Sequence, residues 1–142
     1  MTDHYYSSGK LILTGEYLVL YGADALVLPL LFGQTMSVSE DAFSKQRSIR
    51  WTAKQNGNIW FSALIEPETF SILETNSLPV YKKLIKLFQV ISRAQPERFA
   101  RSLSFETNIN FRRTWGFGTS STLINNLASW ANLDPFQLHF RV

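Results

Sequence analysis

The sequence contains no cysteine among its 142 residues. This excludes a disulfide framework, a zinc–thiolate site and a cysteine nucleophile. It also lacks a long apolar run, because the longest, Ala25 to Phe32, is interrupted by Pro29. The first residues, Met1 to Tyr6, have neither the basic start nor the apolar core of a secretory signal. We therefore expect a cytoplasmic protein without a membrane-spanning segment.

The chain also has only a small excess of positive over negative charge. The formal net charge is +3, and charged residues make up 18% of a chain that is 45% hydrophobic. Such a chain can bury roughly two-thirds of its unfolded surface around one core, so we expect one domain spanning residues 1–142. Basic residues cluster only at Lys82-Lys83-Lys86 and Arg112-Arg113. Because this falls short of a nucleic-acid footprint, nucleic acid is not an expected partner.

The first half of the chain is rich in strand patterns. Two apolar runs, Ser48–Lys54 and Ile59–Ile65, flank an Asn56-Gly57 pair that is typical of a two-residue hairpin turn. Earlier apolar or alternating runs, separated by Gly-containing turns, predict strands over Tyr5–Ser8, Lys10–Thr14, Ala25–Leu31 and Thr35–Ser39.

Helical periodicity begins after Ser77 and continues until Pro96. The apolar residues at helical spacing are Val80, Leu84, Leu87, Phe88 and Ile91. An alternating run over Ser102–Phe111 then predicts a strand, and a stripe of Leu123, Leu127 and Trp130 predicts a helix from Ser120. Another helical stretch starts at Asp134-Pro135. The pattern is that of an α+β fold in which helices cover a sheet.

The segment from Trp115 to Thr122, between that strand and that helix, combines glycines with hydroxyl residues. Gly116 and Gly118 can adopt positive φ, so that successive N–H groups line a concavity suited to an anion. The following helix adds unpaired amides and a partial positive charge. The hydroxyls of Ser120 and Ser121 are hard ligands of the kind that a phosphate-bound Mg²⁺ accepts. The segment predicts a phosphate site, although ordinary loops and helix caps use the same residues.

A second segment, Ser8 to Gly22, indicates a strand with Lys10 at its start and Glu16 just past a turn at Gly15. Together the two segments resemble the GHMP kinases, named for galactokinase, homoserine kinase, mevalonate kinase and phosphomevalonate kinase. That family has a Pro-Gly-Lys-x-x-Leu-x-Gly-Glu-His pattern and, later, a Gly-Leu-Gly-Ser-Ser-Ala phosphate loop before a helix. The matching residues, in the same order, are Gly9, Lys10, Leu13, Gly15, Glu16 and Gly22, then Gly116, Gly118, Ser120 and Ser121.

The sequence departs from these patterns at four positions. Ser8 replaces a proline, Thr119 replaces the first loop serine, and Thr122 replaces an alanine. Thr119 keeps a hydroxyl for contact with phosphate or metal. Tyr17 stands where the family often has histidine beside the phosphoryl acceptor, which leaves the identity of the acceptor open.

The resemblance implies an α+β domain like the second domain of ribosomal protein S5, with a mixed or antiparallel sheet covered by helices. It also implies an ATP-dependent kinase that transfers a phosphoryl group to a small-molecule hydroxyl or phosphate, with a mevalonate-pathway substrate preferred because the opening motif looks most like mevalonate kinase. Lys10 would offset charge on the transferred phosphate, and Ser120 would ligate Mg²⁺. The residues expected to bind ATP are Gly116, Gly118, Thr119, Ser120 and Ser121, and those facing the acceptor are Glu16 and Tyr17.

In the family, further sequence supplies an acidic residue that activates the acceptor and a second Gly-rich motif in a carboxy-terminal domain. We therefore expect a truncated kinase whose carboxy-terminal domain and catalytic base are missing, and which is inactive alone. Such a chain can self-associate through the surface that the missing half would cover. Two other functions stay open: a nucleotide-binding or interaction module without catalysis, and an RNA-binding domain.

Overall fold

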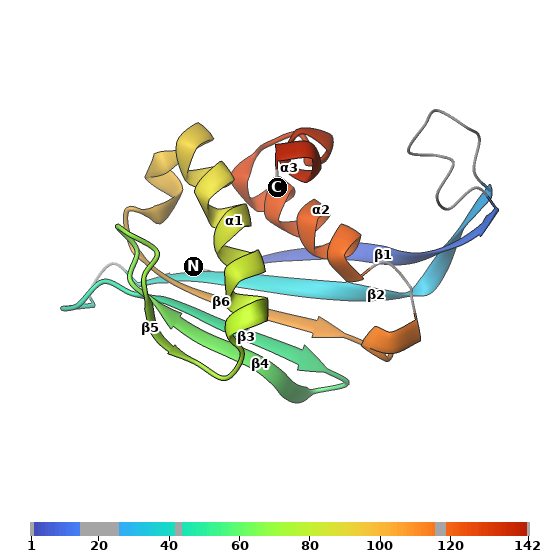
Figure 1. Cartoon of the computed structure of the whole chain (residues 1–142), viewed down its shortest axis with the longest axis horizontal. Coiled ribbons are helices and arrows are strands. Elements are labelled where there is room, and N and C mark those ends of the chain that lie inside the picture. The colour runs from blue at the N-terminus through green and yellow to red at the C-terminus, as the bar shows by residue number, and fades with distance from the viewer. Residues whose placement is uncertain (1, 15–25, 42–43, 116–118, 142) are drawn as a thin grey trace.

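The computed structural model of the chain describes residues 2–14, 26–41, 44–115 and 119–141. It has a six-stranded mixed sheet with helices packed on one face (Figure 1). The strands are β1 (Thr2–Thr14), β2 (Leu26–Asp41), β3 (Ile49–Gln55), β4 (Asn58–Ile65), β5 (Ile72–Thr75) and β6 (Ser102–Ile109). The helices are α1 (Leu78–Ala94), α2 (Thr119–Ala131) and α3 (Pro135–Arg141), with short 3-10 helices η2 (Pro96–Phe99) and η3 (Arg113–Trp115). The predicted α+β fold is confirmed.

The sheet has the strand order β1-β2-β6-β3-β4-β5. Neighbouring strands are antiparallel except β3 and β6, which are parallel. The chain passes from β5 at one edge, through α1, back to the middle of the sheet, so that β6 lies between the β1–β2 ribbon and the β3–β4 hairpin. The segment after β6, which leads through η3 to α2, therefore starts between these two pairs of strands.

Strands β1 and β2 form one long antiparallel ribbon. The sequence predicts a Gly-containing turn within each of them, and that prediction is wrong: Gly9 lies within β1, where the register shifts, and Gly33 lies within β2. A Cβ on Gly33 would collide with the Tyr6 hydroxyl and with the main-chain oxygen of Ser7. Instead of forming turns, Gly9 allows a register shift within β1, and Gly33 allows the neighbouring strand to approach its backbone closely. Pro29 is tolerated because β6 pairs only with the later part of β2, beginning at Gln34.

The predicted hairpin and helices are confirmed. Asn56 and Gly57 have φ values of 49° and 81°, the left-handed conformations that a two-residue hairpin turn requires. Helix α1 follows Ser77 and ends before Pro96, and α2 and α3 begin at Thr119 and Pro135. The sequence missed β5, η2 and η3, because elements of three or four residues are too short to show a periodic pattern.

The core between the sheet and the helices is rich in aromatic rings. Phe88 of α1 and Phe105 of β6 are fully buried. Their rings, with those of Trp51, Phe99 and Trp130, form contacts with centroid separations of 5.0 to 5.8 Å. Each such pair adds about 0.5–1.5 kcal/mol beyond burial of apolar area. The rings therefore join α1, α2 and the central strands into one core.

The loop between β4 and β5 is held by Glu66. Its carboxylate accepts hydrogen bonds from the Thr69 hydroxyl and from the main-chain N–H groups of Glu68 and Thr69. The Thr69 hydroxyl bond is the largest cause that lowers the Glu66 pKa below its ordinary value of 4.5, followed by the two main-chain bonds. The charged carboxylate therefore favours the folded loop.

We predict that Glu66→Ala lowers the free energy of unfolding at neutral pH, and that the difference from wild type shrinks in acid. A carboxyl with a depressed folded-state pKa contributes stability above its unfolded pKa and loses it as the pH falls through the folded pKa. Urea unfolding of both proteins from pH 7 to well below 4.5, the ordinary pKa, measures the effect. A difference that stays constant with pH would contradict it.

Candidate functional site

A buried hydrogen-bond network fixes α2 on β1 and β2. Thr122 Oγ1 donates to Gln34 Oε1 at 2.8 Å, and Asn126 Nδ2 donates to the Gln34 main-chain oxygen at 3.1 Å. Ser7 Oγ donates to Asn126 Oδ1 at 2.7 Å. Gln34, Thr122 and Asn126 are each at most 4% exposed. Because buried polar groups are costly unless paired, this network specifies both the position and the rotation of α2.

The network places α2 over the middle of the β1–β2 ribbon, where Ser7 and Gln34 pair, and the helix starts farther along the direction in which β1 runs (Figure 1). Lys10 lies three residues past Ser7 in β1, about 10 Å along the strand. Ser120 lies six residues before Asn126, about 9 Å along the helix. Each position therefore lies within about 10 Å of the Ser7–Asn126 hydrogen bond, measured along its own element.

Ser120 lines a cavity of about 390 Å³ between α1, α2 and the sheet. A cavity of this size with apolar walls and a few polar groups is typical of a small-molecule site. Lys83 and Arg113 bring positive charge to it, and Gln34, Thr107 and Ser120 bring neutral polar groups. Its apolar walls are formed by Trp51, Ala53, Trp60, Phe61, Val80, Leu84, Leu87, Leu123 and Ile124.

Trp60 reaches the cavity through a bulge in β4. Ala53 of β3 pairs with Phe61 and Lys54 pairs with Ile59, so that Trp60 has no partner residue on β3. In a regular strand, Trp60 and Phe61 would point to opposite faces of the sheet. The bulge allows both rings to line the same cavity. The main-chain oxygen of Trp60 accepts a hydrogen bond from Asn76 Nδ2 at 3.3 Å.

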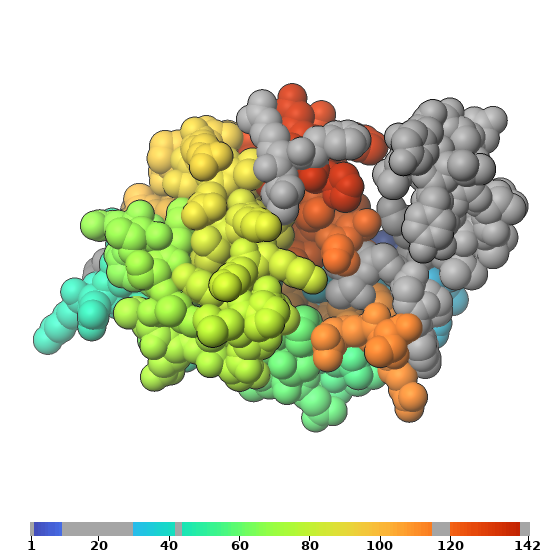
Figure 2. Space-filling model, viewed as in Figure 1, coloured from blue at the N-terminus to red at the C-terminus, as the bar shows by residue number. Residues whose placement is uncertain are grey.

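Arg113 of η3 lies over the Trp60 ring. The guanidinium carbon is 3.8 Å from the ring centroid, which is a close cation–π contact. The main-chain N–H of Arg113 donates to Gln55 Oε1 at 3.2 Å, and that of Asn56 donates to the Ile109 oxygen at 2.8 Å. These bonds tie the β3–β4 hairpin to the segment that leads into α2. Figure 2 shows α1 (yellow-green), this hairpin (green) and η3 (orange) on one face of the molecule.

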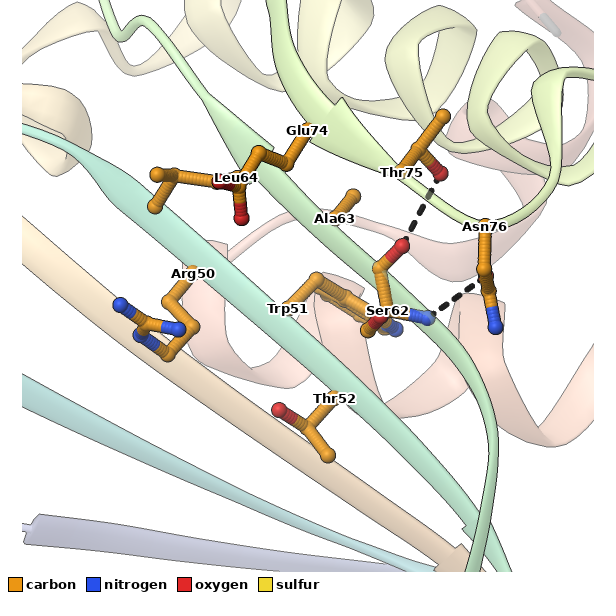
Figure 3. A pocket seen from close by; sticks show the side chains of 9 residues that line it. All are labelled: Arg50, Trp51, Thr52, Ser62, Ala63, Leu64, Glu74, Thr75 and Asn76. Carbon is orange, nitrogen blue, oxygen red and sulfur yellow. Dashed lines mark hydrogen bonds between the residues drawn. The ribbon is translucent and has the colours of Figure 1, made fainter.

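A second hollow, of about 280 Å³, lies on the sheet face away from the helices (Figure 3). Arg50, Thr52 and Leu64 line it from β3 and β4, and Glu74 lines it from β5. No residue that the sequence predicted for a site is among the residues lining this hollow. The first cavity is therefore the better candidate.

The structure describes some of the predicted site residues fully, some by their backbone only and others not at all. Ser120 is exposed and lines the cavity. Ser121, the next residue in the first turn of α2, is half-buried. Lys10 pairs through its backbone with Pro29, and Thr119 begins α2, but their side chains lie outside the described part of the structure. Gly116, Gly118, Glu16 and Tyr17 also lie outside the described residues. The roles given to all of these residues stay predictions.

Sequence reasoning missed Trp60, Arg113 and Gln34. The sequence places Trp60 in an ordinary strand, and it presents Arg113 only as one of a pair of adjacent basic residues. No local pattern reveals a bulge, since it shows itself only in the pairing of two strands. In sequence Thr122 is a departure from the family loop, and in the structure its hydroxyl donates to Gln34.

The described residues were also compared with the requirements of a metal site and of a membrane-spanning helix. Within ranges 2–14, 26–41, 44–115 and 119–141, no three acidic or histidine side chains are grouped so that they could hold a metal ion. The helices of these same ranges are too short or too polar for any of them to cross a membrane.

In sequence, the chain matches no protein-family model and no curated protein. In structure, it is similar to mevalonate kinase from Methanococcus jannaschii, with a TM-score of 0.62 and 16% identity over 99% of this chain and 44% of that one. For mevalonate kinase from methicillin-resistant Staphylococcus aureus, the TM-score is 0.55 and the identity 17%, over 92% and 37%. For mevalonate diphosphate decarboxylase from Enterococcus faecalis, the values are 0.51 and 12%, over 96% and 38%. The chain has the fold of the amino-terminal part of the GHMP kinases.

The resemblance to the GHMP kinases that two sequence motifs indicated is thus confirmed at the level of the fold. The chain spans about two fifths of the length of the GHMP-fold structures it matches. The candidate cavity and the start of α2 lie within this shared part.

We predict that Thr122→Val lowers the free energy of unfolding by about 1–3 kcal/mol, because it removes the buried donor to Gln34 while keeping the side-chain shape. Thr122→Ser, which restores a hydroxyl, should recover most of the loss. Urea unfolding of the three proteins measures this. A valine variant as stable as wild type would show that the network does not hold α2.

Proposed function

We propose that this chain is the nucleotide-binding part of a GHMP-type kinase and that it binds Mg-ATP. The observation that carries the proposal is the apolar cavity that Ser120 lines at the start of α2. A nucleobase is planar and stacks through its faces, which the cavity's aromatic and aliphatic walls suit. The first turn of α2 suits phosphate, because the N–H groups of a helix's first turn have no partner within the helix and its dipole favours an anion.

The phosphate part of the proposal keeps the residues expected from the family. The main chain of Gly116, Gly118, Thr119 and Ser121 would hold the triphosphate, together with Ser120, whose hydroxyl would be a ligand of Mg²⁺. Lys83 and Arg113 support this assignment, since both cations border the same cavity. The chemical character of the described lining therefore fits a base joined to an anionic chain.

Mg-ATP, when bound, supplies the phosphoryl group that is transferred. Phosphoryl transfer depends on alignment and on stabilisation of charge, with little covalent work for the protein. Lys10 would offset charge on the transferred group, and Glu16 and Tyr17 would bind the acceptor. Two of the similar structures are mevalonate kinases, and in the Enterococcus faecalis decarboxylase mevalonate diphosphate mediates ATP binding. We therefore propose a mevalonate-pathway hydroxyl or phosphate as the acceptor.

Calorimetry with Mg-ATP, paired with an ATP-consumption assay in the presence of mevalonate and its phosphates, tests the two levels of the proposal. Saturable Mg-ATP binding supports the nucleotide site, and ATP consumption that depends on the acceptor supports the kinase. Binding without turnover would instead support a nucleotide-binding module. The absence of Mg-ATP binding would reject both.

We predict that Ser120→Ala weakens binding of Mg-ATP by at least about tenfold and leaves binding of metal-free ATP little changed, because the lost hydroxyl contacts the metal. Calorimetry in Mg²⁺ and in EDTA measures the two affinities. Ser129→Ala, an exposed position near the far end of the same helix, is the matched control. Equal losses in both buffers would argue against Ser120 as the ligand.

A further inference from the structure

The contact between Arg113 and Trp60 occupies a surface that a planar ligand would use. The bulge in β4 turns the Trp60 ring into the cavity, and the guanidinium lies 3.8 Å from the ring centroid. A guanidinium is planar and stacks on aromatic faces much as a heterocyclic base does. A base entering this cavity and the Arg113 side chain therefore compete for the same ring face.

The main chain of Arg113 is held by a hydrogen bond, whereas its side chain is able to change its contact partner. The N–H group of Arg113 is bonded to Gln55 Oε1, and the neighbouring hairpin is tied to the end of β6. The side chain itself is bound through the ring contact with Trp60. An exposed cation–π contact is weaker than a charge-assisted pair between arginine and phosphate. The side chain can thus exchange partners without moving the backbone.

We propose that Arg113 is a specificity-determining residue that makes this site select phosphorylated nucleotides over bare nucleosides. In the ligand-free protein the guanidinium stacks on Trp60. A base displaces it, and the released side chain then pairs with the phosphate chain of the same ligand. A nucleoside must break the stack without gaining a replacement contact, whereas a nucleotide gains the arginine–phosphate pair. This inference rests on the proposed nucleotide site and adds a source of its selectivity.

Arg112 provides a matched comparison within the chain. It carries the same charge one residue earlier, is exposed, and is not among the residues that line the cavity. A general electrostatic effect of positive charge near the site would make Arg112 and Arg113 behave alike. The proposed exchange of partners concerns Arg113 alone.

The test is calorimetry of wild type, Arg113→Gln, Arg113→Lys and Arg112→Gln with adenosine, Mg-ATP and inorganic tripolyphosphate. In Arg113→Gln we expect adenosine to bind about two- to fivefold more tightly, because no cation competes for Trp60. The same variant should bind Mg-ATP and tripolyphosphate about tenfold or more weakly, because the pair with phosphate is lost. Arg112→Gln should leave all three affinities near those of wild type.

Arg113→Lys separates charge from stacking. Lysine keeps the positive charge but lacks the planar fork. Its tripolyphosphate affinity should stay nearer to wild type than that of Arg113→Gln, while adenosine binds more tightly than to wild type. Circular dichroism and urea unfolding of each variant check that the fold is retained.

The decisive result is that Arg113→Gln raises the affinity for adenosine and lowers the affinity for Mg-ATP. If Arg113→Gln weakens adenosine and Mg-ATP equally, Arg113 is a fixed wall of the site and the exchange is refuted. Unchanged affinities, or the same changes in Arg112→Gln, also refute it. If wild type binds Mg-ATP but the sign reversal is missing, only this inference fails. If wild type binds neither Mg-ATP nor tripolyphosphate, the nucleotide site fails and the inference fails with it.

Discussion

The position of α2 depends on one buried amide residue, Gln34. Its side chain and its main-chain oxygen both accept hydrogen bonds from α2, and Asn126 of that helix is bonded in turn to Ser7 of β1. Apolar packing alone is not directional, so it permits a helix to slide or rotate on a sheet. Polar groups buried at this depth must be paired, and they are paired in one register only. The first two turns of α2 are thereby fixed over the middle of the β1–β2 ribbon, where Ser7 and Gln34 pair.

The candidate cavity results from departures from regular structure. The bulge at Trp60 adds a ring to the cavity face of β4, and the hairpin holds η3 through Gln55. The two features together place a cation against an aromatic ring beside the first turn of α2. Bulges occur at such places because an extra residue re-aims a side chain while the strands on either side stay paired. The rigid sheet and aromatic core support a site whose selectivity comes from these local exceptions.

Sequence and structure agree on the family resemblance through different parts of the molecule. In sequence, the resemblance rests on two short motifs around Lys10 and Ser120, whereas the structural similarity extends over most of the chain at 12–17% identity. At such identity a fold persists because the apolar pattern of its strands and helices is kept while individual residues change. Function depends on particular side chains, so the kinase chemistry is proposed from the cavity and from Ser120.

The sequence by itself determined the hairpin at Asn56-Gly57, helix α1 between Ser77 and Pro96, and the order of strand, Gly-rich segment and helix around Ser120. These features follow from local rules: turn residues with positive φ, helical periodicity and proline boundaries. Only the tertiary structure decided that Gly9 and Gly33 lie inside continuous strands, that Trp60 turns into the cavity, and that Thr122 bonds to Gln34. Those outcomes depend on which strands pair and which faces meet, and contacts between residues far apart in the chain leave no periodic signal in either segment.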